Sequence, residues 1–413
     1  MRPMEAELSL CHVQKWLAKD GPVYLAMREM PTIELDVIAR PGASSLMSHQ
    51  IILSFAFIVF GIQQGQASIA HKGWALYGKA LTRLNGALSD PTGYARDEVC
   101  VSVIALTCLE MLAPTSPENR IRHIVGLERI LDLRGPHAYC SDEHFDVLNC
   151  TTILMFDASL HTAKPSILAK PEWKTVMWAR CSDEDALKQE LHDLIADCTV
   201  LGAERNAIAG MSSRNTSHLG HTRQRDALEH KALDLRAQFF AWKQRWDRNP
   251  GNSPIVSEPL RENQELSRYG FLIEPAAAIY MAFHTALIFV HRLLATIPEE
   301  MIGTRSAEPS NEEYPVQTAR LSGTAQTRKD GYRAAEQLAA VEISRCIPYN
   351  SNLAATAQSG TSSAFAWAVL NAWETVGGSA SAEGRRMLDL LRANGGEDTA
   401  TLLEVHSPAL ASA

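Results

Sequence analysis

Residues 74–136 constrain the fold of this chain most strongly, because three consecutive amphipathic helices are encoded there together with their start and stop signals. Apolar side chains recur at three- and four-residue steps over 68–88, which predicts the first helix. A turn at 89–93 follows, and the apolar run 96–112 predicts a second, mostly buried helix. The region therefore begins as a helical hairpin.

The third helix has the clearest boundaries. Ser116 precedes Pro117; serine is a preferred N-cap, and proline suits the first helical position. Gly135 supplies a left-handed stop, and Pro136 prevents the helix from continuing. Gly126 inside this helix costs about 1 kcal/mol relative to alanine in a solvated position. We therefore expect a neighbouring backbone to approach it closely.

The rest of the chain shows the same helical periodicity, and no alternating run is long enough for a convincing strand. The further helices that we expect span 4–19, 46–63, 141–161, 184–201, 222–246, 276–297, 332–346, 362–376 and 382–393. The stretch 210–220 is polar and rich in Ser and Asn, which indicates an exposed loop. We predict an all-α fold, an irregular multi-helix domain of packed helical hairpins.

Changes of composition divide the chain. We expect a lead-in segment at 1–45 and the main part of a helical regulatory domain at 46–297. A flexible linker at 298–330 would follow, then C-terminal helices at 331–404 that pack on the main part, and a tail at 405–413. The linker is dominated by Gly, Ser, Thr, Glu and Pro without an apolar period, so we expect disorder at 304–325.

Charge and hydropathy exclude several classes of protein. The chain has 39 Lys and Arg against 47 Asp and Glu, and its net charge of -8 opposes a polyanion, so we expect no direct nucleic-acid binding. The apolar stretch 276–297 contains His284, His291 and Arg292. A membrane span needs about 20 nearly uncharged residues, so this stretch predicts a buried core helix. No signal peptide is indicated at 1–10.

The eight cysteines are scattered, and no Cys-x-x-Cys occurs. This pattern favours small buried side chains in a reducing compartment and predicts no cysteine zinc site within the chain. His284 and His291 lie seven residues apart on one helix face, but no third ligand stands at metal spacing beside them. We therefore favour two satisfied core histidines over a metal site.

No catalytic motif is present: the chain lacks a nucleophile elbow, a His-Glu-x-x-His sequence, a phosphate-binding glycine loop and a dinucleotide fingerprint. Asp97 and Glu98 suit a helix cap better than an acid–base pair, because adjacent helical residues point about 100° apart. We predict that the chain is not an enzyme and has no catalytic, cofactor-binding or metal-ligating residues.

Two groups of residues carry a family likeness. The first group is Tyr77, Ala80, Leu81, Leu84, Leu88, Asp97, Glu98, Leu109, Glu110, His123, Gly126, Arg134, Gly135 and Pro136. The second group is Phe365, Ala366, Trp367, Ala372, Trp373, Glu374, Gly377, Arg385 and Arg386. With this order of helices, the chain resembles the regulatory domain of fungal-specific transcription factors, the helical region that follows a zinc binuclear cluster. The likeness covers about 46–404.

Eight of these residues form the structural motif that the resemblance singles out: Asp97, Glu98, His123, Gly126, Arg134, Gly135, Pro136 and Trp373. We expect them to pack and cap helices and to have no part in catalysis. Arg134 at a helix C-terminus is expected to satisfy free carbonyl groups or to clamp a carboxylate. His123 is expected to be a hydrogen-bonded spacer between helices.

The resemblance implies a nuclear regulator of RNA polymerase II transcription that acts through protein or small-molecule binding. Its partners would be other transcription regulators or a homodimer partner, and a small apolar effector would lie among the apolar faces of 46–60 and 276–297. The family's DNA-binding module needs six clustered cysteines in a basic region, which this sequence does not contain. Zinc would therefore enter only through a separate N-terminal cluster. Without the resemblance, we expect a cytoplasmic protein.

Two alternative hypotheses remain. A scaffold of the transcription-factor type can be recruited as a small-molecule-binding protein or enzyme of a biosynthetic cluster. It can also serve as a co-regulator that binds a complete factor. The coding sequence upstream of Met1 separates the transcription factor from the recruited protein, because six clustered cysteines there would favour the transcription factor. A pull-down from nuclear extract separates the co-regulator from the enzyme.

Overall fold

The computed structural model describes residues 3–13, 47–113, 116–212, 218–257, 268–272, 274–297, 328–356 and 363–406. Over these residues the fold is all-α, as predicted, with fourteen α-helices. The strands β1 (Ile255–Ser257) and β2 (Arg268–Gly270) form one short antiparallel pair, with Val256 opposite Tyr269. The sequence did not predict this pair, because three residues are too few to show an alternating pattern.

The first half of the molecule consists of successive helices that pack on their sequence neighbours. They are α1 (Pro3–Val13), α4 (Met47–Gln63), α5 (Ala67–Ser89), α6 (Asp97–Leu112), α7 (Pro117–Arg134) and α8 (Asp142–Thr162). Helix α4 has no charged residue and is buried on nearly all sides by α1, α5 and α6, as expected for a helix that is apolar all round.

The second half continues with α9 (Pro171–Ala179), α10 (Ala186–Ser212), α11 (His218–Trp246), α12 (Glu274–Thr296), α13 (Arg328–Thr356), α14 (Ser363–Thr375), α15 (Ala382–Ala393) and α16 (Glu397–His406). Short 3-10 turns lie between helices at η2 (Gly93–Ala95), η3 (Pro136–Tyr139), η4 (Ile167–Ala169), η5 (Pro250–Asn252) and η6 (Gly378–Ala380).

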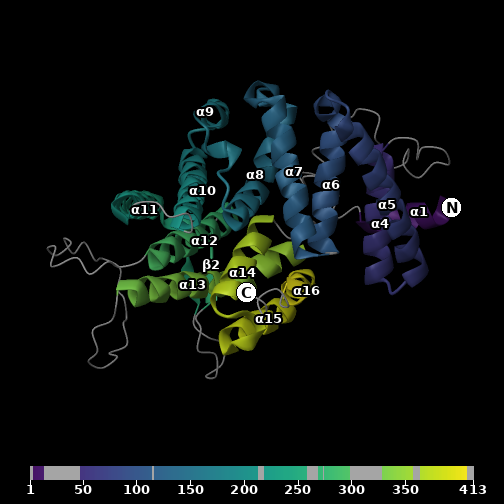
Figure 1. Ribbon diagram of the computed structural model, residues 1–413. Coiled ribbons are helices and arrows are strands. Elements are labelled where there is room, and N and C mark those ends of the chain that lie inside the picture. The colour runs from purple at the N-terminus through teal and green to yellow at the C-terminus, as the bar shows by residue number, and fades with distance from the viewer. Residues whose placement is uncertain are drawn as a thin grey trace.

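Helix α12 is the centre of the second half, because α10, α11, α13 and α14 all pack against it. Its stretch Ala276–Thr296 is long and apolar enough to cross a membrane, yet most of it is buried inside the molecule, as expected for a core helix. Helix α14 also packs against α8 and so joins the C-terminal helices to the first half. In Figure 1, α1, α4 and α5 lie at one end, α9–α13 at the other, and α6–α8 between them.

Several predicted helix boundaries are wrong. Helix α10 extends to Ser212 and α11 begins at His218, so most of the expected loop 210–220 is helical or lies outside the described residues. Ile208 packs against the core and Glu204 pairs with Lys231 of α11, contacts that extend α10 past its polar composition. The expected linker 298–330 ends earlier, because α13 begins at Arg328.

Helix α13 also continues to Thr356, past Pro348, and α16 is a helix that the sequence did not predict. Ile347 is fully buried, and Tyr349 donates a hydrogen bond to the carbonyl oxygen of Phe271 at 3.0 Å. These contacts hold the turn around Pro348 in a helical path. The lead-in segment beyond Val13 and the stretch 304–325 lie outside the described residues, as does the tail after His406.

Candidate functional site

Three residues of the first family-like group meet between α5, α6 and α7. The Tyr77 hydroxyl donates to Oε1 of Glu110 at 3.0 Å and lies 3.4 Å from Nε2 of His123. Glu110 is fully buried. Burial, and then the Glu110 charge, raise the pKa of Tyr77, whereas burial lowers the pKa of His123. The phenol and the neutral imidazole therefore act here as hydrogen-bonded spacers between helices.

Arg134 makes both kinds of contact expected of it. Its Nε donates to the carbonyl oxygen of Tyr94 at 2.9 Å, and its Nη2 donates to that of Ala95 at 3.2 Å. The same Nη2 lies 3.1 Å from Oδ1 of Asp97. The side chain of Arg134 is 6% exposed, so these are largely desolvated, charge-assisted contacts. They attach the end of α7 to η2 and the start of α6.

Glu98 caps a helix other than its own. Its Oε1 accepts from the backbone N–H groups of Met47 at 2.5 Å and Ser48 at 3.2 Å. These are the first residues of α4, whose N–H groups have no acceptor within the helix. A carboxylate at this position is favoured by the positive end of the helix dipole. Asp97 and Glu98 thus have separate structural roles.

The helix-end signals of α7 are confirmed. Ser116 accepts from the N–H of Asn119, Gly135 adopts a φ of 77°, and Pro136 begins η3. The packing expected around Gly126 is wrong, because a Cβ added there would meet no atom within 4 Å. No close backbone approach requires glycine at this position.

Trp373 of α14 packs against and hydrogen-bonds to α15. Its indole is fully buried, and Nε1 donates to the carbonyl oxygen of Gly384 at 3.2 Å. A Cβ on Gly384 would collide with the carbonyl oxygen of Gly378, so the α14–α15 turn requires a very close backbone approach. Gly93 is equally close-packed, because a Cβ there would collide with the carbonyl oxygen of Ala87.

A buried charged cluster joins α7, α8 and α14. Arg120 pairs with Asp157, and Nδ1 of His161 lies 3.0 Å from Oδ1 of Asp157. Burial alone would raise the pKa of Asp157, but Arg120 and His161 outweigh it and hold that pKa well below its usual range. Burial raises the pKa of Glu374 nearby, against the opposing effects of His161 and Arg292.

Sequence reasoning missed this cluster. Arg120, Asp157 and Glu374 are 37 or more positions apart from one another, and none stands in a local motif. Only the inclusion of Glu374 in the second family-like group pointed towards it. The cluster nevertheless brings Glu374 of the second group beside an ion pair that links α7 to α8.

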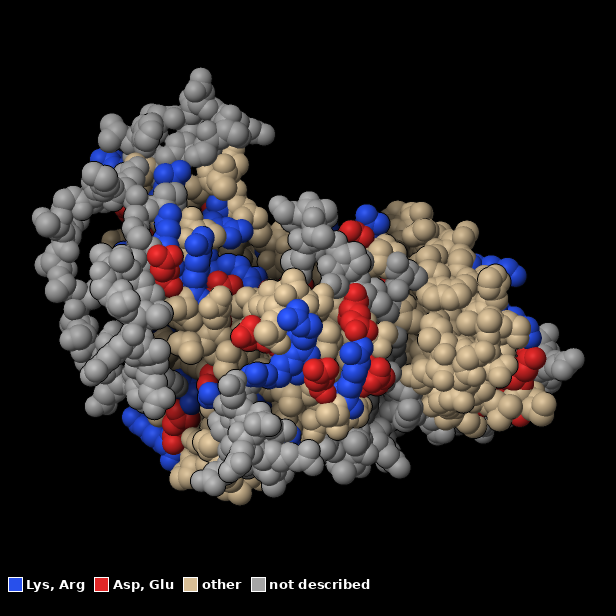
Figure 2. Space-filling view, turned by 90° about the horizontal axis from the view of Figure 1, so that it is seen from below, with Lys and Arg blue, Asp and Glu red and all other residues tan. Residues whose placement is uncertain are grey.

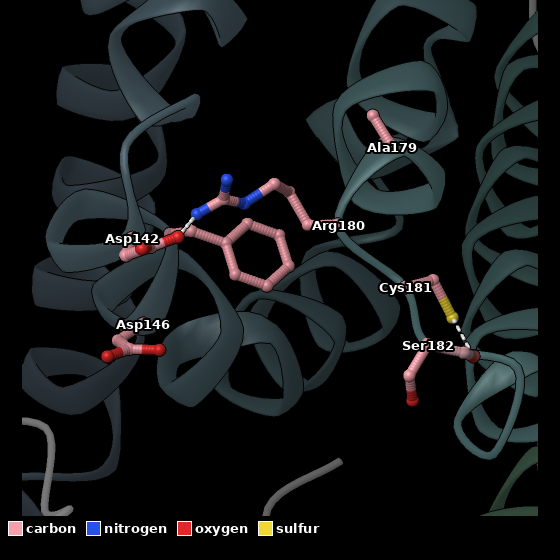
Figure 3. Close-up of a pocket in the computed structure, with 7 residues that line it drawn as sticks. Asp142, Asp146, Ala179, Arg180, Cys181 and Ser182 are labelled. Carbon is pink, nitrogen blue, oxygen red and sulfur yellow. Dashed lines mark hydrogen bonds and ion pairs between the residues drawn. The ribbon is translucent and has the colours of Figure 1, made fainter.

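A cavity of about 500 Å³ opens on the surface between the start of α8 and the end of α9 (Figure 3). Arg180 pairs with Asp142 at its wall, and the Arg180 guanidinium lies 5.7 Å from the centre of the Phe145 ring. Asp146 comes from the next turn of α8 on the same side (Figure 3). Arg180 thus already engages both the Asp142 carboxylate and the face of the Phe145 ring.

Cys181 and Ser182 complete the lining of this cavity. The thiol donates to the carbonyl oxygen of Ser182 at a distance of 3.4 Å (Figure 3). Burial, followed by the charge of Asp185, raises the pKa of Cys181, so the thiol stays protonated at neutral pH and is a poor nucleophile. The lining therefore suits non-covalent binding.

Among the described residues, no group of three or more His, Cys, Asp and Glu side chains is placed to hold a metal ion. His284 and His291 are both buried, as expected, but they are not both satisfied. Neither ring nitrogen of His284 has a hydrogen-bond partner, and Nδ1 of His291 has none. Burial lowers the pKa of each to about 3.

The effector position expected between 46–60 and 276–297 is wrong. Helix α4 buries its apolar faces against α1, α5 and α6, whereas α12 buries its faces against α10, α11, α13 and α14. The two helices lie far apart across the molecule (Figure 1). Each apolar face is thus used by its own half of the core.

A stretch of 102 residues is 29% identical to the uncharacterized protein AN5342 of Emericella nidulans. The match covers 25% of this chain and 22% of that protein, so this chain spans about a fifth of the relative's length. No family model matches the chain. No solved structure matches it either.

Proposed function

We propose that this chain is the helical regulatory region of a fungal-specific transcription regulator, and that the region acts without binding DNA itself. The observation that carries the proposal is the contact among residues of the first family-like group. Tyr77 contacts both Glu110 and His123, and Arg134 clamps the start of α6 at Asp97. Residues of the first family-like group thus form two contacts between helices, one at Tyr77 and one at Arg134.

Charge supports a regulator that reaches DNA through other proteins. The net charge of -8 gives no general attraction for a polyanion. We propose that the chain works in the nucleus with other transcription regulators or a second copy of itself. The cavity at Asp142, Phe145 and Asp146 supports protein contact, because it opens at the surface and is lined by an aromatic ring and by charged side chains of both signs.

Tethering tests this function. The chain is fused to an unrelated DNA-binding module and brought to a reporter promoter in a fungal host. We expect reporter transcription to change, up or down, relative to the DNA-binding module alone. An unchanged reporter with a fusion that is expressed, folded and nuclear would contradict the proposal.

A matched pair of variants locates the contact. Asp142→Asn with Asp146→Asn removes both carboxylates of the cavity, whereas Asp183→Asn with Glu184→Gln removes two exposed carboxylates outside it. If the cavity receives a partner, the first pair weakens the reporter effect and the second pair leaves it unchanged. Equal effects of the two pairs would remove the cavity from the mechanism.

A second candidate is a small-molecule-binding protein built on the same scaffold. The unpaired ring nitrogens of buried His284 and His291 favour it, because buried polar groups without partners are uncommon and often mark a missing ligand or water. This candidate predicts ligand binding with no reporter effect, which separates it from the first.

A further inference from the structure

Arg236 on α11 is a partly buried cation held in a defined orientation. Its Nε donates to Nε2 of His291 at 3.3 Å, and its guanidinium lies 5.0 Å from the centre of the Phe240 ring. No carboxylate among the described residues pairs with it. The remaining N–H donors of its planar fork therefore have no anionic acceptor.

Other arginines of the core differ from Arg236 in this respect. Arg134 pairs with Asp97, Arg292 with Glu336 and Arg345 with Glu342, and Arg120 is neutralised by Asp157. Each of these four arginines is thus paired with a carboxylate. A partly desolvated guanidinium without an anion is costly, and a bound anion would relieve that cost.

His291 can hold Arg236 in place but cannot neutralise it. The imidazole is 3% exposed, and burial followed by the charge of Arg236 lowers its pKa to about 3. At neutral pH it is uncharged, and its Nε2 serves as the acceptor for Arg236. Its Nδ1 then carries the proton, and this nitrogen has no partner.

The surroundings add further positive charge and apolar surface. Tyr332 of α13 stacks on His291 with ring centres 6.3 Å apart. Arg328 donates to the Tyr332 hydroxyl at 3.2 Å and pairs with Glu229 of α11. Glu229 is thereby engaged by Arg328. Lys and Arg side chains gather over this part of the molecule, with Asp and Glu among them (Figure 2).

We propose that the oxyanion group of a small molecule, a carboxylate or a phosphate, binds Arg236 at this junction of α11, α12 and α13. A planar guanidinium fits both groups through two parallel N–H···O bonds. Phe240 and Tyr332 flank the site and suit a ligand that carries an apolar or aromatic portion next to its acid group. His291 is a positioning residue that orients the fork.

Calorimetric titration at low ionic strength tests the site, with inorganic phosphate and benzoate as separate probes. We expect at least one probe to bind the wild-type chain and Arg236→Gln to weaken that binding by about tenfold or more, the loss of one charge-assisted contact. Arg223→Gln is the matched control, because Arg223 is an exposed arginine on the same helix. It should leave the affinity unchanged. The preferred probe identifies the class of acid.

Arg236→Lys keeps the charge but not the fork. It should bind with an intermediate affinity if the contact is bidentate, and it provides the comparison if Arg236→Gln does not fold. Failure of both probes to bind wild type at about 10 mM, a concentration that detects even weak sites, overturns the proposal. So does equal affinity of wild type and either Arg236 variant.

Discussion

Arg134 shows how one side chain can join separate segments, because its guanidinium serves two carbonyl oxygens and one carboxylate at the α5–α6 connection. Arg134→Ala would leave those groups partly desolvated and without their donor. We expect it to lower the free energy of unfolding by about 1–3 kcal/mol, measured by urea denaturation.

Arg129→Ala on the same helix is the control. The Arg129 side chain is 67% exposed, and the substitution would remove only its contact with Asp132 at 3.5 Å. It should change stability by less than about 0.5 kcal/mol. Equal effects of the two substitutions would show that the Arg134 contacts contribute nothing specific.

Gly126 provides the opposite case, a glycine that the packing does not need. Gly126→Ala should stabilise the protein by roughly 0.5–1 kcal/mol, because alanine has the better helix propensity and nothing obstructs its Cβ. Gly384→Ala should destabilise it, because the added Cβ would strike the Gly378 carbonyl oxygen. Thermal denaturation of both variants checks the pair, and a destabilised Gly126→Ala would reveal packing that the structure lacks.

At the scale of a residue, the sequence predicted what depends on near neighbours. The Ser116 cap and the Gly135 stop act within a few positions, so their patterns are visible in the chain. The pairing of Arg120 with Asp157 depends on how α7 crosses α8, which no local pattern encodes. The role of Glu98 at α4 was hidden for the same reason.

At the scale of an element, the aromatic stripe of α11 is core, as predicted. Trp242 is fully buried, stacks on Trp246 and Phe283 with ring centres 5.4 Å apart in each case, and donates from Nε1 to the carbonyl oxygen of Leu187 at 2.7 Å. Trp242→Ala should cost about 3–5 kcal/mol in chemical denaturation. A cost below about 1 kcal/mol would show that α11 is not anchored there.

Helix α12 makes stability depend on pH. Burial lowers the pKa of His284 to about 3, so its ring is neutral in the fold, whereas in the unfolded chain it titrates near 6.5. The unfolded state therefore binds more protons between these values. The contribution of His284 to the free energy of unfolding is therefore present in full only above pH 6.5, and it is lost as the pH drops towards 3.

His284→Leu removes one such group and leaves no unpaired ring nitrogen. We expect equal or greater stability at pH 7, and a slope of unfolding free energy against pH that is smaller by about 1 kcal/mol per pH unit between pH 6 and 4. His291, whose pKa is also about 3, remains in both proteins and accounts for part of the residual slope. An unchanged slope would mean that His284 has the same pKa in the fold as in the unfolded chain.

The presence of a helix was easier to predict from the sequence than the residues at which it ends. The periodic apolar runs of α6, α7 and α14 were located within one or two residues, because their own composition ends them. Helices α10 and α13 run further than their patterns, since contacts such as Glu204 with Lys231 and Tyr349 with Phe271 stabilise turns of unfavourable composition. Tertiary contacts thus override local propensity there.

At the scale of the whole molecule, one apolar core runs through both halves, and α8 of the first half packs against α10 and α14 of the second. The apolar faces of α4 and α12 looked alike in the sequence, and hydrophobicity alone could not show that they belong to different parts of the core. The surface around α1, α4 and α5 carries few charged side chains in Figure 2, whereas charge is concentrated over the other parts of that face.

Of the candidate sites, the helix junctions at His123 and Arg134 were accessible from sequence because their residues carry the family likeness. The Arg236 site and the cavity beside α8 were not. Each is assembled from helices whose relative positions depend on the complete fold, and each uses residue types that occur commonly on protein surfaces.

Reporter transcription from the tethered chain, measured across variants of known stability, tests the central claim most directly. A folded regulatory scaffold predicts a reporter effect that is retained in Gly126→Ala and falls with the folded fraction in Arg134→Ala and Trp242→Ala. No effect from the folded wild-type chain would contradict the account. An effect that persists when Trp242→Ala is unfolded would also contradict it, because the scaffold would then not be its source.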